Sequence, residues 1–164
     1  MRNLALLGLA LVLSLAACGG SGRRAAGDAR LEQEADSYQI DQIEKIWHKA
    51  SSTKDVALMM TIWAPNATFN VGTDTYAGKA QIRGFFAHMA GPFKPENDWI
   101  SDTPAYKVRI TVNGDKGTLY FQCHYLDRRT GKLASIVAAD QDVRKIDGKW
   151  LITKSVAAPA RLGS

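Results

Sequence analysis

The chain has only two cysteines, Cys18 and Cys123, among its 164 residues. Two cysteines cannot form a disulfide-rich scaffold or a four-cysteine zinc site. The three histidines, His48, His88 and His124, include no pair four residues apart and no His-x-His, so we expect no metal site. The sequence also lacks the G-x-G-x-x-G and G-x-S-x-G motifs of nucleotide-binding proteins and serine hydrolases, and we expect no cofactor.

Clustered charge is also missing. The formal net charge is +5, but from Asp36 onward the only adjacent basic pairs are Arg128-Arg129 and Arg144-Lys145. A nucleic-acid site with roughly 6–10 phosphate contacts usually needs more clustering, so we expect no nucleic-acid partner. Hydrophobic residues make up 46% and charged residues 23%, which is typical of a globular domain and excludes wholesale disorder.

The longest apolar run, residues 4–17, is too short to span a membrane. As a helix it would measure about 21 Å at roughly 1.5 Å per residue, against roughly 30 Å for a bilayer core. Arg2 precedes the run and small residues end it, which is typical of a secretory signal peptide. We therefore predict that residues 1–17 are a signal peptide.

The end of this run, Leu15-Ala16-Ala17-Cys18, resembles a bacterial lipobox. The resemblance implies cleavage before Cys18, lipid on its thiol, and a chain anchored in a membrane of the cell envelope, facing outside the cytoplasm. The alternative is a secreted protein with a free Cys18. Residues 19–30 are small or charged without apolar periodicity, so we expect residues 18–35 to form a lipidated, flexible tether.

Three short helices are predicted at the start of the folded domain, which we place at residues 36–160. Asp36 or Ser37 can cap the first helix and Thr53 or Asp55 the second, which should end before Pro65. Each helix places apolar residues on one face at helical spacing. These faces carry Ile40, Ile43, Trp47 and Ala50; Val56, Met59, Met60 and Trp63; and Ile82, Phe85, Phe86 and Met89.

Strands are predicted after the helices. Alternating side chains and the turns Asn113-Gly114 and Asp147-Gly148 indicate an antiparallel meander. Because helices come first and strands later, the pattern predicts an α+β fold in which three N-terminal helices pack on a curved, mainly antiparallel mixed sheet. The predicted strands span residues 67–71, 106–112, 118–127, 133–146 and 149–156.

Three stretches of this domain resemble the SnoaL-like branch of the nuclear transport factor 2 (NTF2)-like superfamily. They are Ile62-Trp63-Ala64-Pro65-Asn66-Ala67-Thr68-Phe69, then Tyr76-Ala77-Gly78-Lys79-Ala80-Gln81-Ile82-Arg83-Gly84-Phe85-Phe86, and finally Asp147-Gly148-Lys149-Trp150-Leu151-Ile152. The resemblance implies a cone-shaped sheet around an apolar pocket and often a homodimer through the outer sheet face. The fold hosts enzymes and non-catalytic binders alike, so it does not assign an activity.

Alternation along residues 118–127 divides the expected pocket from the outer face. Leu119, Phe121, Cys123 and Tyr125 form the more apolar set and should face the helices. The opposite set, with Tyr120, Gln122 and His124, could face a partner subunit. The residues that we expect to line the pocket are Trp47, Trp63, Phe86, Tyr106, Phe121, Cys123, Tyr125 and Gln141.

The catalytic pair of the ketosteroid-isomerase relatives is missing at the matching positions. Trp47 stands where those relatives place a tyrosine, and Val71 where they keep a carboxylate base. Gln141 falls near their second acid, although Asp140 or Asp142 could take that place with a shift of one residue. An aliphatic side chain cannot accept a proton, and an indole cannot replace a phenol as an acid. The remaining candidates are Asp74 in the loop after the first strand, Asp140 and Asp142 on one strand face, and the histidines His48 and His88.

These observations favour an exported lipoprotein that binds a small apolar or amphipathic ligand in the cone. One alternative is an acid/base enzyme of the isomerase, dehydratase or cyclase kind. The other is a protein-interaction module that acts through the outer sheet face. An apolar cavity without an acid would favour the binder, a cavity with an unpaired ionisable group the enzyme, and a filled cone the interaction role.

Overall fold

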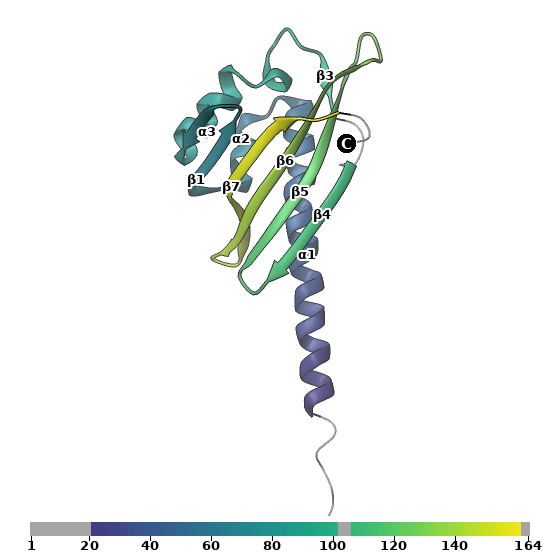
Figure 1. Cartoon of the computed structure of the whole chain (residues 1–164), viewed down its shortest axis with the longest axis vertical. Helices are drawn as coiled ribbons and strands as arrows, with labels where there is room; N and C mark the ends of the chain where they lie inside the picture. The colour runs from purple at the N-terminus through teal and green to yellow at the C-terminus, as the bar shows by residue number, and fades with distance from the viewer. Residues whose placement is uncertain (1–20, 102–105, 162–164) are drawn as a thin grey trace, which may run out of the picture.

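The computed structural model describes residues 21–101 and 106–161, with side chains from Gly27 onward except that of Tyr106. Three α-helices of this part pack on one face of a seven-stranded sheet, which confirms the predicted α+β fold (Figure 1). The helices are α1 (Ser21–Thr53), α2 (Val56–Met59) and α3 (Gly78–His88), and the 3-10 turns are η1 (Met60–Ile62) and η2 (Gly91–Phe93). The strands are β1 (Trp63–Val71), β2 (Asp74–Ala77), β3 (Trp99–Ile100), β4 (Tyr106–Asn113), β5 (Lys116–Asp127), β6 (Leu133–Ile146) and β7 (Lys149–Pro159).

The sheet is mixed, and only one of its strand pairs is parallel. Its order is β2-β1-β7-β6-β5-β3, and β4 also pairs with β5. The pair β1–β7 is parallel, and the other pairs between the described strands are antiparallel. This arrangement agrees with the predicted mixed, mainly antiparallel sheet. Both predicted turns lie where expected. Asp147-Gly148 connects β6 to β7, and Asn113-Gly114 lies between β4 and β5.

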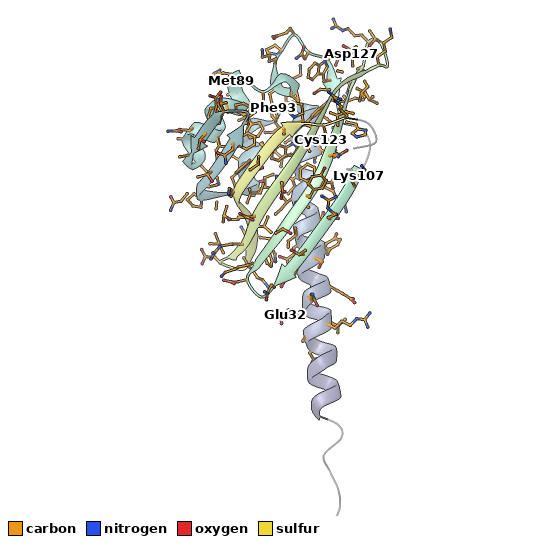
Figure 2. All side chains as sticks on the ribbon, viewed as in Figure 1. Glu32, Met89, Phe93, Lys107, Cys123 and Asp127 are labelled. Atoms are coloured by element: carbon orange, nitrogen blue, oxygen red, sulfur yellow. The ribbon has the colours of Figure 1, made fainter. Side chains whose placement is uncertain are left out.

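Helix α1 begins much earlier than the sequence predicts. It covers residues 21–35, where we expected a flexible tether, and residues 27–35 project from the sheet fully exposed (Figure 1). Glu32 lies on this projecting part (Figure 2). The segment contains strong helix formers and an Arg30–Glu34 ion pair of 3.0 Å one turn apart. Within the described residues, no helix is long and apolar enough to cross a bilayer.

The second half of α1 packs on the sheet through the predicted stripe. Ile40, Ile43, Trp47 and Ala50 are all buried, which confirms that face of the helix. Gly117 of β5 also lies against this helix. A Cβ there would lie 3.1 Å from Ile40 Cδ1 and only 2.5 Å from the backbone oxygen of Thr111 on β4, so the close approach of β4 to β5 requires glycine.

The second predicted helix is shorter than expected. Asp55 caps α2, since its carboxylate accepts a 2.8 Å hydrogen bond from the Leu58 amide. The chain then forms η1 and enters β1 at Trp63, so Trp63 belongs to a strand and not to the second helix. Pro65 is tolerated in β1 because the register with β7 shifts between Trp63 and Thr68, and the ladder has no pair at Pro65.

A strand that the sequence analysis missed precedes α3. Asp74 was expected in a loop, but it begins β2, which pairs antiparallel with β1. Helix α3 then runs where predicted and buries Ile82 and Phe86, although Met89 beyond its end is exposed.

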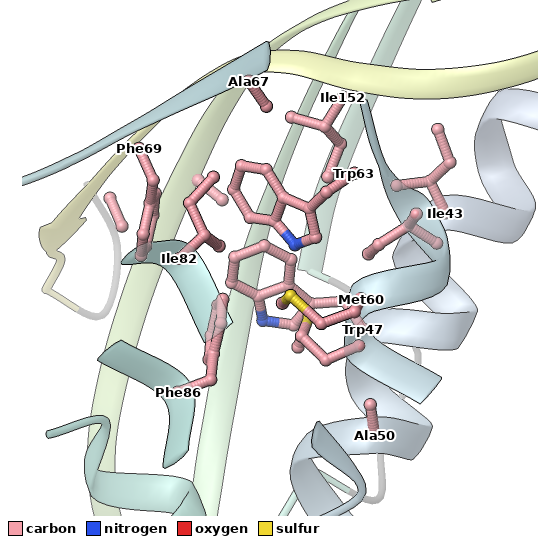
Figure 3. Close-up of a cluster of buried hydrophobic side chains, with 14 of the residues drawn as sticks. Ile43, Trp47, Ala50, Met60, Trp63, Ala67, Phe69, Ile82, Phe86 and Ile152 are labelled. Carbon is pink, nitrogen blue, oxygen red and sulfur yellow. The ribbon is translucent and has the colours of Figure 1, made fainter. Parts of the chain in front are cut away.

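Aromatic and aliphatic side chains pack together between the helices and the sheet (Figure 3). Trp47 of α1 lies at the centre, with its ring centroid 6.0 Å from that of Trp63, 5.5 Å from Phe86 and 5.7 Å from Phe121. Phe69 of β1 stacks on Phe86 at 5.5 Å. Most of these contacts are tilted or edge-to-face, the geometries that aromatic pairs prefer. The cone is therefore largely a packed core.

Candidate functional site

A small apolar cavity remains at one end of this core. Its volume is about 120 Å³. Its walls come from α1, α3, the segment Ala90–Phe93 and strands of the sheet. Met89 and Phe93 lie at the same end of the molecule (Figure 2). The lining residues are Trp47, Ser51, Phe69, Val71, Phe85, Phe86, Ala90, Gly91, Pro92, Phe93, Tyr125, Val137 and Ala157.

The segment that closes one side of the cavity is held by Lys54. The Lys54 ammonium donates hydrogen bonds to the carbonyl oxygens of Lys94 at 3.0 Å and Asn97 at 2.6 Å. The Asn97 side chain in turn donates to the Gly91 carbonyl at 2.9 Å. These bonds join the end of α1 to the segment after α3. The cavity wall is therefore fixed by polar contacts outside the cavity, and the wall itself can remain apolar.

Tyr125 and Ser51 supply the polar atoms of the cavity wall. The Trp47 indole N–H donates to the Tyr125 hydroxyl at 3.4 Å, and that hydroxyl donates to Ser51 Oγ at 3.4 Å. Burial raises the pKa of the Tyr125 phenol well above its ordinary value, so the phenol is neutral at pH 7. The wall thus offers weak, uncharged hydrogen-bonding groups beside an aromatic surface.

The residues expected to line the pocket fall into three groups. Trp47, Phe86 and Tyr125 line the cavity. The others lie within the core beside it or outside the described side chains. Trp63, Phe121 and Cys123 are buried on the inner face without lining the cavity, Gln141 is buried on the same face, and the side chain of Tyr106 lies outside the described part.

A second buried group joins α1 to the chain after β3. His48 Nε2 lies 3.1 Å from Glu44 Oε1, and His48 Nδ1 is hydrogen-bonded to Ser101 Oγ. The thiol of Cys123, which is labelled in Figure 2, also contacts this group. Its sulfur lies 3.5 Å from His48 Nε2. The four side chains are buried, and none of them lines the cavity. Our sequence analysis missed Glu44 and Ser101, although the i, i+4 spacing of Glu44 and His48 offered a signal.

Burial sets the protonation state of this group. It lowers the pKa of His48 from 6.5 to about 4 and outweighs the hydrogen bond with Ser101, so the imidazole is neutral at pH 7. A neutral ring carries one proton, which suits donation from Nε2 to the Glu44 carboxylate and acceptance at Nδ1 from the Ser101 hydroxyl. Burial also raises the pKa of the Cys123 thiol, so this cysteine is not a thiolate nucleophile.

The other acid/base candidates do not converge on the cavity. Asp140 and Asp142 share one face of β6, as predicted, but that face is the exposed outer one. Asp74 and His88 are exposed at β2 and at the end of α3. Gln122 lies on the outer face of β5, as expected, but its side chain is buried there. Its amide donates a 2.8 Å hydrogen bond to the Tyr120 hydroxyl.

A larger depression of about 560 Å³ lies between α1 and the β4–β5 turn. Its walls include Asp36 and Lys145, which form a 2.8 Å ion pair. Burial alone would raise the pKa of the Asp36 carboxyl, but hydrogen bonds from Lys145 and Trp150 together lower it. These charges already satisfy one another, and the pair joins α1 to the last hairpin. We therefore assign the depression a structural role.

Comparison with solved structures finds the same fold in several bacterial proteins. The chain is similar to an NTF2-like protein with a cystatin-like fold from Novosphingobium aromaticivorans (TM-score 0.67, 18% identity, covering 87% of this chain and 91% of that one). It is also similar to a protein of unknown function with a cystatin-like fold from Nostoc punctiforme (TM-score 0.67, 18% identity, 77% and 92%). A putative dehydratase of the NTF2-like family from Streptomyces avermitilis gives a TM-score of 0.62 at 16% identity, with 78% and 98% covered.

Sequence comparison identifies the family. No curated protein matches the sequence closely enough to count as a relative. The profile of the SnoaL-like domain, however, matches residues 32–156, which include almost the whole sheet and every cavity-lining residue except Ala157. The chain therefore belongs to the SnoaL-like domain family.

Proposed function

We propose that this SnoaL-like domain binds one small, mainly apolar molecule in the cavity beside Trp47 and Tyr125. The observation that carries the proposal is the lining itself. Aromatic and aliphatic side chains form nearly all of it, and none of the described Asp, Glu, Lys, Arg or His residues contributes to it. Concave apolar surfaces with a few polar groups are typical of small-molecule sites.

The size of the cavity limits the ligand. Its volume of about 120 Å³ is below the roughly 300–1,000 Å³ of common ligand pockets. An engineered apolar cavity of about 150 Å³ in another protein binds benzene. We therefore propose a ligand with a single ring, or a larger molecule that inserts one ring or a short chain.

The acid/base enzyme has less support. The exposed aspartates Asp74, Asp140 and Asp142 lie outside the cavity, and so does His88. His48 is buried against Glu44 and Ser101 and does not line the cavity. The features that favour catalysis are thus separated from the feature that favours binding.

Filling the cavity should abolish ligand binding. Ala157→Leu adds three carbons at a buried lining position on β7, so we expect at least a tenfold loss of affinity for toluene, measured by ligand-observed NMR. Ala158→Leu is the matched control, because the next residue of the strand is exposed and points to the opposite face. Equal toluene affinity in the two variants would contradict binding in this cavity.

We also propose that lipid on Cys18 holds the domain at a membrane of the cell envelope. Cys18 lies outside the described residues, and the proposal is supported by the lipobox-like sequence Leu15-Ala16-Ala17-Cys18. Stable anchoring by acyl chains needs more than one chain, which a diacylated cysteine would supply. We expect Cys18→Ala to move the protein from the membrane fraction to the soluble fraction in its native host. A variant that remains wholly in the membrane fraction would refute the anchor.

A further inference from the structure

Two buried polar side chains near the cavity have no partner of their own. Gln141 is 1% exposed and Ser155 is not exposed at all. Among the described residues, neither amide atom of Gln141 nor the hydroxyl of Ser155 has a hydrogen-bond partner. Buried polar side-chain atoms are nearly always paired, and an unpaired group costs stability. These two side chains therefore need an explanation.

The two side chains lie next to each other on the inner face of the sheet. Gln141 of β6 is directly opposite Ser155 of β7, and Ser155 is directly opposite Phe69 of β1. On the other side, Gln141 pairs with Leu119. Paired residues share a face, and Phe69 and Leu119 belong to the core. Gln141 and Ser155 therefore face the helices together.

This pair lies beside the cavity, one row of the sheet away from its wall, and is not part of the lining. The next inner-face row of the sheet holds Ala139 opposite Ala157, and Ala157 lines the cavity. Phe69, in the same row as Ser155, lines it too. Successive residues on one strand face are about 6.6 Å apart. On β6 and β7 themselves, only the methyl groups of Ala139 and Ala157 lie between the pair and this wall of the cavity.

The unpaired indole nitrogen of Trp63 has a different explanation. Figure 3 shows it on the side of the ring that faces Trp47, and the two ring centroids are 6.0 Å apart. An N–H group can donate weakly to an aromatic face. Trp63 therefore needs no ligand, and Gln141 and Ser155 remain as two unpaired polar side chains that lie together on the inner face of the sheet.

We propose that Gln141 and Ser155 recognise an uncharged group that both donates and accepts hydrogen bonds, such as an amide, on the ligand's ring. The inference rests on the proposed function and adds the chemical class of the ligand. The glutamine amide offers a donor and an acceptor side by side, and serine offers both on one atom. An amide can pair with both, whereas a hydrocarbon leaves all of these atoms unsatisfied.

The same site disfavours an anion. No Lys, Arg or His contributes to the cavity lining, and the nearest buried histidine, His48, is neutral and bonded elsewhere. Burial of a carboxylate without a cation is very costly. A neutral amide should therefore bind more tightly than the carboxylate of the same shape.

Three probes of similar size separate the possibilities: toluene, benzamide and benzoate. For the full-length protein we expect benzamide to bind at least roughly tenfold more tightly than toluene, and benzoate most weakly, measured by ligand-observed NMR at pH 7.5. If toluene binds and benzamide binds no better, this inference fails and the proposed function stands. If none of the three binds, the proposed function fails as well. Tighter binding of benzoate than of benzamide would also overturn the inference.

Substitution of the glutamine tests the residue itself. Gln141→Leu removes the amide at similar size, so we expect the benzamide affinity to fall to that of toluene while the toluene affinity is unchanged. In the ligand-free protein the midpoint of thermal unfolding should rise, because an unpaired buried group is removed. Gln39→Leu, at an exposed position of α1, is the matched control and should change neither quantity.

Ser155→Ala provides an independent variant that removes one oxygen and adds nothing. We expect it to lower the benzamide affinity about threefold to tenfold without lowering the unfolding midpoint. If both Gln141→Leu and Ser155→Ala keep the wild-type preference for benzamide over toluene, the two residues do not recognise the ligand. A fall in the unfolding midpoint of both variants would mean that the polar atoms are satisfied within the protein, which also overturns the inference.

Discussion

Replacement of Trp63 by alanine is expected to lower the free energy of unfolding by about 3–5 kcal/mol. The Trp63 side chain is completely buried at the start of β1, and its ring contacts those of Trp47, Phe69 and Phe86. Its removal loses the transfer free energy of a large apolar group and leaves a cavity that a rigid aromatic cluster cannot close. Urea unfolding followed by circular dichroism measures the change.

Tyr38→Ala is the matched control for this experiment. It also truncates an aromatic residue, but Tyr38 is 64% exposed on α1, so its loss should change stability by less than about 0.5 kcal/mol. If Trp63→Ala cost no more than Tyr38→Ala, the aromatic cluster of Figure 3 would not be the main core of the domain.

Acidification from pH 7 to pH 4 is expected to destabilise the domain through His48. Its pKa is about 4 in the folded protein, against an ordinary value of 6.5, so the unfolded chain binds a proton that the folded chain does not. The contribution of His48 is therefore complete above about pH 6.5 and is lost as the pH falls towards 4. The loss amounts to about 3 kcal/mol, and it can be measured from urea unfolding at a series of pH values.

His48→Gln isolates this effect from other titrations. Asp36 and Asp127 also have lowered pKa values, and both lose their stabilising contributions as the pH falls further. These contributions are present in the wild type and the variant and cancel in their difference. We expect the difference in stability between the two proteins to shrink by about 3 kcal/mol from pH 7 to pH 4. A difference independent of pH would show that His48 does not titrate in this way.

Regular patterns in the sequence predicted most of the fold. The stripe from Ile40 to Ala50 identified the buried face of α1, because a helix repeats its face every three or four residues. The alternation of Phe121, Cys123 and Tyr125 identified the buried face of β5 in the same way. Such patterns depend only on local geometry, so they can be recognised in the sequence without knowledge of the rest of the structure.

Features that depend on distant partners were not predictable. Pro65 indicated the end of a helix, but the register shift that accommodates it in β1 arises from pairing with β7. The side chains of residues 27–35 bury no apolar stripe, and this segment continues a helix that is already fixed by packing, which costs less than starting a new one.

The candidate site was predictable only in part for the same reason. Trp47, Phe86 and Tyr125 stood out as aromatic residues on apolar faces, and they do line the cavity. Ser51 and Ser155 have no local signal, because a serine on a strand or helix is usually solvated. Ser51 is buried because α1 packs on the sheet, and Ser155 is buried because it lies on the inner face of the sheet, which the helices cover.

The unbroken course of α1 has a consequence for orientation. One helix contains both the projecting residues 27–35 and Trp47 in the cavity wall. Each residue of an α-helix rotates the chain by about 100° and advances it by about 1.5 Å. The number of helical residues before Trp47 therefore sets the direction in which the cavity faces, relative to the N-terminal end of α1. Insertion of one residue before Asp36 would rotate the cavity by about 100° around the axis of α1, relative to the N-terminal end of the helix. It would move the cavity only about 1.5 Å further from that end.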